Sequence, residues 1–364
     1  MHRKECQIRP HQHTGQGLNE PLVIAGKEIK PGSKEIIDFP LPPLSTHSDL
    51  NMPIHVLRGK RSGPCLLVCA ALHGDEINGI EIIRRLVGLK SLASLRGTLI
   101  AIPIVNVYGF IHMSRYLPDR RDLNRSFPGS EKGSLAARLA NLFMQEIVSK
   151  ATHGIDLHTA AIHRDNFPQI RGNLDFDETL WLAKAFRAPL IIDAPLRPGT
   201  VREAAVSKGI PWLVYEAGEA LRFDEISIRG GVRGIVNVMR EIGMLPSKKS
   251  EKTYSPRIVK SNFWIRAPQS GILRLTAKLG ACVNKDDTLG YVADPYGGNQ
   301  AQIIAPNTGI IIGRTNLPLV HEGDALVHLA RFHHTGNASN AVDQFQSELD
   351  PEEMEGLSGA DPIA

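Results

Sequence analysis

The sequence contains few cysteines and few aromatic residues. Its four cysteines include no Cys-x-x-Cys pair, which excludes both a disulfide scaffold and a cysteine-rich zinc site. Any metal ion would therefore need histidine and carboxylate ligands, and the 14 histidines leave that option open. Aromatic residues make up only 5% of the chain, which argues against a stacking surface for single-stranded nucleic acid.

Long apolar runs and a strong excess of one charge are also absent. No run of about 18 apolar residues occurs, so no transmembrane helix is predicted. The first residues lack the apolar core of a signal peptide, and the net charge of +4 is too small to indicate a nucleic-acid partner. We therefore expect a cytoplasmic protein with neither a nucleic-acid nor a membrane partner, and a homo-oligomer stays open.

Apolar strand-like runs alternate with helical patterns over most of the chain. This alternation predicts an α/β fold with a mixed sheet flanked by helices. A charged, proline-bounded stretch near 246–257 is typical of a linker, and short glycine-punctuated strands follow it. The expected organisation has four parts. A flexible N-terminal tail (1–20) precedes an α/β domain (21–246), and a small all-β barrel-sandwich-like domain (258–332) precedes a flexible C-terminal tail (333–364).

The expected elements of the α/β domain come from apolar spacing. Period-two or continuous apolar runs predict strands, and apolar residues three and four apart predict helices. The predicted strands are 64–72, 98–110, 155–159 and 210–218. The predicted helices are 77–89, 134–151, 178–186 and 229–245. In the β-rich part, 265–273 and 303–311 match at a spacing of 38, which indicates two related β units.

Two histidine motifs follow predicted strands. His73 and Glu76 lie in the turn HGDE after the first strand, where both side chains can converge on one ion. His158 stands near the end of the strand IDLHT, with Asp156 on the same face to orient its ring. Each motif alone is more often a surface pair or a hydrogen-bonded histidine. Together they supply the two histidines and one carboxylate of a catalytic zinc site.

Two further motifs carry candidate catalytic groups. Glu216 follows the apolar strand before YEAGE, where burial raises a carboxylate pKa toward the range of a general base. Glu219 is almost equally placed, so Glu216 is favoured only modestly. The loop 114–129 is rich in arginines, which are either solvated or bind a substrate carboxylate and polarise a carbonyl.

The order HGDE, DLNRSFPG, DLHTA and YEAGE resembles the succinylglutamate desuccinylase/aspartoacylase family of the zinc carboxypeptidase-like group. The resemblance covers roughly residues 50–330. It implies one zinc ion per chain and hydrolysis of the amide bond of a small, acidic N-acyl amino acid. The metal ligands it implies are His73, Glu76 and His158.

The resemblance also implies roles for the remaining motif residues. Glu216 would be the general acid/base, and Asn124 and Arg125 would hold the substrate carboxylate. Arg115 most resembles the arginine that polarises the scissile carbonyl. Because the segment before DLNR is longer than in typical aspartoacylases, Arg120 or Arg121 could take that role instead.

The β-rich part resembles a biotinyl/lipoyl-like domain, but its hairpin 293–302 has no lysine, so no prosthetic group is expected. Its expected role is to shape or cover the site, or to serve in assembly. Two alternative functions stay open. One is a metallocarboxypeptidase that acts on a peptide C-terminus, and the other is a non-catalytic binding protein with a degenerate zinc site.

Overall fold

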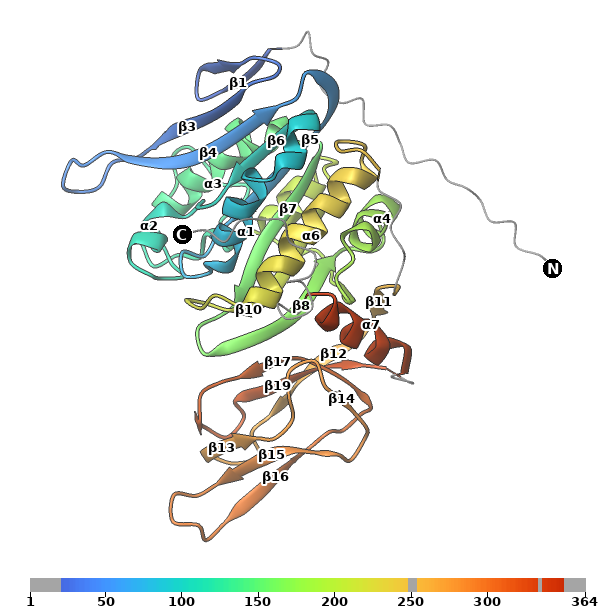
Figure 1. The fold of residues 1–364 in the computed structure, drawn as a ribbon. Coiled ribbons are helices and arrows are strands. Elements are labelled where there is room, and N and C mark those ends of the chain that lie inside the picture. The colour runs from blue at the N-terminus through green and yellow to red at the C-terminus, as the bar shows by residue number, and fades with distance from the viewer. Residues whose placement is uncertain (1–20, 248–253, 333–335, 350–364) are drawn as a thin grey trace, which may run out of the picture.

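A large mixed sheet runs through the computed structural model, which describes residues 21–247, 254–332 and 336–349 (Figure 1). Its middle strands are parallel and lie in the order β10-β7-β5-β6. Their bounds are Arg61–Ala70 for β5, Arg96–Ile102 for β6, His153–Ala160 for β7 and Trp212–Glu219 for β10. Every residue of β7 is buried, because helices cover both faces of the sheet.

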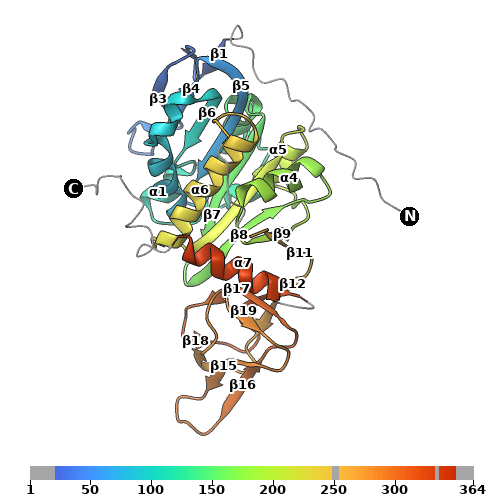
Figure 2. The same cartoon turned by 45° about the vertical axis from the view of Figure 1, so that its right-hand side comes forward.

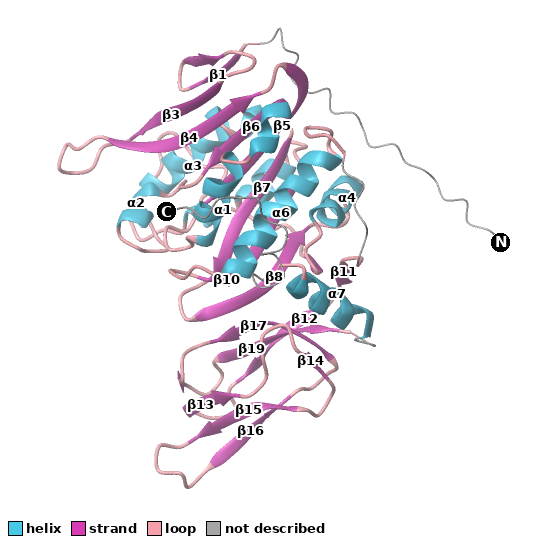
Figure 3. Ribbon diagram, in the orientation of Figure 1, coloured by secondary structure: helices cyan, strands magenta, loops and turns pink. Residues whose placement is uncertain are grey.

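Helices lie on both faces of these parallel strands (Figure 3). In β5, Cys65, Leu67 and Cys69 contribute to one apolar cluster, while Leu66 and Val68 contribute to the other. The first cluster includes α2 (Val107–Ile111), α3 (Leu135–Glu146) and α5 (Val201–Val206). The second includes α1 (Asn78–Val87), α4 (Asp177–Phe186) and α6 (Glu225–Glu241). The 3-10 turns are η1 (Lys90–Ser94), η2 (Leu123–Arg125) and η3 (Val148–Lys150).

Antiparallel strands extend the sheet beyond β6. Strand β4 (Leu50–Arg58) pairs with β6, and β3 (Lys34–Leu41) pairs with β4 at the edge. A separate hairpin consists of β1 (Leu22–Ile24) and β2 (Lys27–Ile29). On the other side of the parallel strands lie β8 (Arg164–Gly172), β9 (Leu190–Asp193) and β11 (Arg257–Val259).

The C-terminal β strands are joined to the α/β part through the same sheet. Strand β17 pairs antiparallel with β8, which places Gly313 opposite Asn166. Strands β12, β19 and β17 continue the large sheet, β14 pairs with β17, and a four-stranded sheet has the order β16-β15-β13-β18. Their bounds are β12 Asn262–Arg266, β13 Gly271–Leu275, β14 Cys282–Val283, β15 Thr288–Ala293, β16 Gln300–Ile304, β17 Gly309–Thr315, β18 Leu319–Val320 and β19 Ala325–Arg331. The predicted fold class, an α/β sheet with helices plus a small β-rich part, is confirmed.

A helix covers the junction between these two parts. It is α7 (Gly336–Ser347), which lies beside β9, β11 and β17 in Figures 1 and 2. Its Ala338 and Val342 pack in one apolar cluster with Phe167 and Ile310. The prediction of a flexible tail from 333 onward is therefore wrong for this helix. The predicted N-terminal tail, 1–20, lies outside the described residues, as do 350–364 and 248–253 within the predicted linker. The domain boundaries themselves stay a prediction.

One predicted strand is longer in the sequence pattern than in the structure. The apolar run 98–110 forms β6 only as far as Ile102, and α2 begins at Val107. Pro103 has no backbone N–H to continue the strand ladder. Asn106 then caps α2 by accepting a hydrogen bond from the Gly109 N–H. Within the described residues, no helix is both long enough and apolar enough to cross a membrane.

Candidate metal centre and substrate cavity

The predicted site residues meet at the carboxyl ends of the parallel strands. His73 and Glu76 lie in the turn between β5 and α1, and His158 lies near the end of β7. Strand β10 runs parallel to β7 with Glu216 beside His158, which brings the fourth candidate to the same edge. The turn packs closely against α2, where a Cβ at Gly74 would come within 2.1 Å of the Gly109 backbone. The backbone of HGDE thus needs glycine at this position.

Three side chains form a compact, buried triad. The Nδ1 atoms of His73 and His158 lie 2.6 Å from Glu76 Oε1 and Oε2, respectively. One potential ligand atom from each residue lies within 4.8 Å of the others. All three residues are buried. The structure therefore brings together the triad that the sequence predicts, and these atoms could hold one metal ion.

Two carboxylates orient the imidazole rings of the triad. His73 Nε2 lies 3.1 Å from Asp122 Oδ1, and His158 Nε2 lies 2.7 Å from Asp156 Oδ2. A carboxylate at Nε2 favours the tautomer with its proton there and leaves the Nδ1 lone pair free for a metal. Both Nδ1 lone pairs would then face the negatively charged Glu76 carboxylate. These groups repel one another unless a cation binds among them. The residues present therefore fit a bound metal ion.

The charges around the triad point to the same conclusion. Burial alone would raise the pKa of Glu76, but the facing imidazoles of His73 and His158 hold it below its ordinary value. Burial opposes protonation of His158, yet Asp156 and Glu76 raise its pKa. The site thus keeps Glu76 negatively charged and favours a positive charge next to the Nδ1 atoms. A metal ion bound there would supply that positive charge.

A cavity of about 360 Å³ opens beside the triad. Glu216 lines it, and the Asn166 amide donates a 3.0 Å hydrogen bond to Glu216 Oε2. Glu219, which the sequence did not separate clearly from Glu216, lies outside the lining. It accepts hydrogen bonds from the His163 backbone and the Asn316 amide. Glu216 is therefore the carboxylate of this motif that faces the cavity.

The structure also separates the arginines of the loop 114–129. Arg115 lines the cavity and donates to Glu76 Oε1 at 3.2 Å and to Asp122 Oδ2 at 3.0 Å. Arg120 and Arg121 are exposed and lie outside the lining residues. Of the three arginines considered from the sequence, Arg115 is thus the one beside the triad.

Asn124 and Arg125 both line the cavity from η2. Asn124 Oδ1 accepts the Val201 N–H at 3.0 Å, which fixes the side chain and leaves its amide N–H groups as donors. Arg125 Nη1 donates to the Asn124 carbonyl, so its guanidinium is held at the exposed edge of the cavity. Both predicted substrate-binding side chains therefore offer hydrogen-bond donors in the cavity that the triad lines.

Several residues around the triad and the cavity were not among the predicted ligands, catalytic residues and substrate-binding residues. Asp122 belongs to the DLNR motif, and its position directly before Leu-Asn-Arg is a signal that could have found it. Trp264 of β12 and His328 of β19 reach the cavity from the C-terminal strands, and no local motif marks them. Four further arginines line the cavity. Arg164 and Arg171 of β8 come from the segment 161–172, where the sequence offered both as residues that could face the site, whereas Arg197 and Arg202 were not predicted there.

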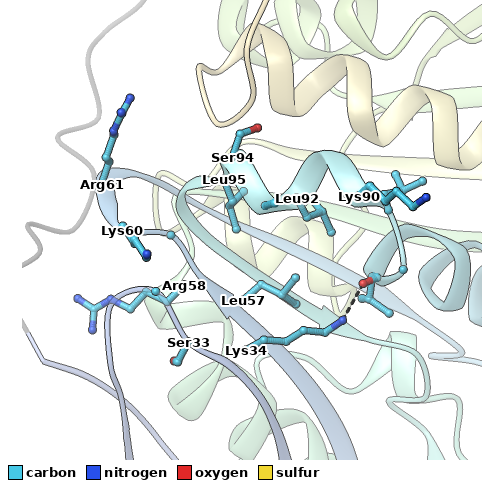
Figure 4. A pocket seen from close by; sticks show the side chains of 16 residues that line it. Ser33, Lys34, Leu57, Arg58, Lys60, Arg61, Lys90, Leu92, Ser94 and Leu95 are labelled. Atoms are coloured by element: carbon cyan, nitrogen blue, oxygen red, sulfur yellow. Dashed lines mark hydrogen bonds between the residues drawn. The ribbon is translucent and has the colours of Figure 1, made fainter.

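A second cavity, of about 560 Å³, lies at the opposite end of the sheet around the turn between β4 and β5 (Figure 4). None of its 16 lining residues is His, Cys, Asp or Glu. Lys34 crosses it and donates to the Val87 carbonyl, as the dashed line shows. It thus offers no imidazole, thiol or carboxylate side chain for metal binding, whereas the smaller cavity is lined by the whole triad and Glu216.

Comparison with known proteins decides the family. The model of the succinylglutamate desuccinylase/aspartoacylase catalytic domain matches residues 62–242, which include the triad and Glu216. The chain belongs to the succinylglutamate desuccinylase/aspartoacylase family. The resemblance predicted from the four motifs is thereby confirmed.

Known proteins resemble the chain over most of its length. The N-alpha-acetyl-L-2,4-diaminobutyric acid deacetylase of Halomonas elongata is 26% identical over 292 residues, which are 77% of this chain and 85% of that protein. A succinylglutamate desuccinylase/aspartoacylase from Rhodobacter sphaeroides superimposes with a TM-score of 0.74 at 25% identity, over 83% of this chain and 96% of its own. The ectoine utilization protein EutE (DoeB) of Ruegeria pomeroyi shares the fold, with a TM-score of 0.75 at 23% identity over 86% and 98% of the two chains.

Proposed function

We propose that the chain is a zinc-dependent hydrolase that cleaves the amide bond of a small N-acyl amino acid or a related carboxylate-bearing amide. The observation that carries this proposal is the buried His73–Glu76–His158 triad beside Glu216 in an arginine-lined cavity. A deacetylase that acts on an N-acetyl amino acid is among the relatives, which supports the reaction class.

Zinc is the metal that this donor set favours. Two imidazole nitrogens and one carboxylate are the protein ligands of many catalytic zinc sites, which keep another position open. Carboxylates at both Nε2 atoms are typical of such sites, since they fix the tautomer and strengthen the ligand. A zinc ion held there supplies Lewis-acid activation of water and of the scissile carbonyl.

The residues around the triad would divide the remaining work. Glu216 would accept a proton from the attacking water and deliver it to the leaving nitrogen, while Asn166 holds its other oxygen in place. Arg115 would donate to the carbonyl oxygen as negative charge develops there. Asn124 and Arg125 would hold the substrate carboxylate and so fix the position of the amide.

Cavity size and charge both favour a small anionic substrate over a peptide. The cavity of about 360 Å³ lies at the lower end of the range for small-molecule sites. Trp264 and His328 from the C-terminal strands form part of its wall. Six arginines line it against three carboxylates, so the cavity has an excess of positive charge that attracts an acidic substrate.

The test is a substrate panel assayed with zinc-loaded protein. The panel contains N-formyl-, N-acetyl- and N-succinyl-amino acids together with dipeptides and longer peptides that share the same C-terminal residues. We expect release of free amino acid from one or more N-acyl amino acids, at kcat/KM values at least about 10-fold above those for every peptide. Preferred cleavage of peptides would instead establish a metallocarboxypeptidase. If no amide is cleaved by protein that retains its metal, the hydrolase proposal is wrong and a binding role remains.

A further inference from the structure

Asn78 is a buried amide that joins the first residue of α1 to the segment that follows Glu216. Its side chain is enclosed, with only 1% of the residue exposed. Its Nδ2 donates to the Ala217 carbonyl at 3.2 Å, and its Oδ1 accepts the Asp224 N–H at 3.1 Å. One side chain therefore holds both ends of the segment 217–224, and no step of the proposed reaction uses it.

The backbone leaves the regular strand directly after Glu216. The stretch of β10 from Glu216 to Glu219 pairs with the shorter stretch of β7 from His158 to Ala160, so β10 carries one extra residue there. Gly218 lies within this bulge and has a φ of +80°, a left-handed conformation that favours glycine. A bulge changes the direction of the side chains next to it. The contacts that hold this bulge therefore bear on where Glu216 points.

Gly218 packs directly against the Asn78 amide. A Cβ at Gly218 would lie 2.3 Å from Asn78 Nδ2, a distance at which the amide would have to move. The glycine thus meets two requirements, because it adopts the positive φ and leaves room for the amide. The hydrogen bond from Nδ2 ends on Ala217, which lies between Glu216 and Gly218. Displacing the amide therefore releases the backbone that carries Glu216.

Two main-chain hydrogen bonds fasten the same segment to its surroundings. The Leu221 N–H donates to the Asp75 carbonyl of the HGDE turn at 2.8 Å, and the Ala220 N–H donates to the last carbonyl of β7 at 3.1 Å. Main-chain bonds remain when a side chain is replaced. In Asn78→Ala the segment should therefore stay on the turn, and the change is expected in its path next to Glu216.

We propose that Asn78 is a positioning residue that holds the backbone after Glu216 and thereby keeps this carboxylate in the wall of the cavity. The inference rests on the proposed function, in which Glu216 is the base. Asn78 does not line the cavity, so it acts through Glu216 and touches no substrate. A displaced base transfers its proton more slowly, whereas the arginines that bind the substrate and the histidines of the triad belong to other elements.

The first experiment separates proton transfer from binding in two variants. Asn78→Ala removes the amide, and Gly218→Ala crowds it from the opposite side. Both should lower kcat by about 10- to 100-fold while KM and the affinity for zinc stay within about 3-fold of the parent. Steady-state kinetics and zinc titration of each variant measure these quantities. Parental kcat in both variants would overturn the inference, and so would a loss of zinc affinity as large as the loss of kcat.

Gly209→Ala is the matched control for Gly218→Ala. Gly209 precedes β10 and has nearly the same backbone conformation, with a φ of +78°, but a Cβ there would meet no atom within 4 Å. The control therefore introduces the same backbone strain without the contact to Asn78. It should keep kcat within about 3-fold of the parent. A loss in Gly209→Ala as large as that in Gly218→Ala would show that strain, and not the contact to Asn78, lowers turnover.

The second experiment places Asn78→Ala in the Glu216→Gln background. If Asn78 acts through Glu216, the added substitution should change kcat by less than about 3-fold, because the group that it positions is already lost. A general structural role would instead lower kcat by the same factor in both backgrounds, which would overturn the inference. Failure of the proposed function gives a different pattern. No turnover by the zinc-loaded parent would contradict the hydrolase, and parental turnover by Glu216→Gln would contradict its base, and the inference would fall with either.

Discussion

Replacing Glu216 with Gln should lower kcat by about 10²- to 10⁴-fold while leaving the zinc content of the protein unchanged. Glutamine has the shape of glutamate, and its oxygen can still accept the hydrogen bond from Asn166. It cannot take a proton from water at neutral pH, so the variant loses the proposed base without a change in packing. Steady-state kinetics and metal analysis of the same preparations measure the two effects.

Glu219→Gln is the matched control for this substitution. The two glutamates lie three residues apart, but Glu219 does not line the cavity. It accepts hydrogen bonds from the His163 backbone N–H in the β7–β8 turn and from the Asn316 amide. We expect Glu219→Gln to retain kcat within about 3-fold of the parent. Near-parental turnover in Glu216→Gln would show that another group transfers the proton.

Replacing His158 with Ala should abolish stoichiometric zinc binding and reduce turnover to the background rate. The substitution removes one of the three proposed protein ligands and leaves the Asp156 carboxylate, which is fully buried, without its imidazole partner. An uncompensated buried charge typically costs about 3–5 kcal/mol, so the free energy of unfolding should fall by roughly that amount. Metal analysis after dialysis and urea unfolding monitored by circular dichroism measure the two losses.

His321→Ala provides the control, because this side chain is 89% exposed and is not part of the triad. It should retain one zinc ion per chain and parental stability. If His158→Ala still bound one zinc ion as tightly as the parent, the triad would not be the metal site.

The triad of His73, Glu76 and His158 could be predicted from the sequence because each residue is tied to a local signal. The turn HGDE follows a run of apolar residues, and the carboxyl end of a buried strand fixes where His73 and Glu76 must lie. The same logic placed His158 at a neighbouring strand end. For the strand end of YEAGE, position alone favoured Glu216 over Glu219 only modestly, and the family resemblance pointed to Glu216. The structure places Glu216 in the wall of the cavity and Glu219 outside it.

The contribution of the C-terminal strands could not be predicted in the same way. Trp264 and His328 reach the cavity only because β17 pairs with β8, a contact between segments about 150 residues apart that no local pattern encodes. Helix α7 was not predicted, although the sequence contains a helical pattern there. Its buried positions Ala338, Ala341, Val342 and Phe345 have helical spacing, but the polar composition around them favoured a tail.

The most direct test of the account is a zinc titration of metal-free protein. The protein is stripped with a chelator, and hydrolysis of the best N-acyl amino acid is measured as zinc is added. We expect no turnover without metal, a linear rise to one equivalent of zinc per chain, and a plateau beyond it. Full turnover by the stripped protein, or no gain on adding zinc, would contradict the claim that His73, Glu76 and His158 hold a catalytic metal.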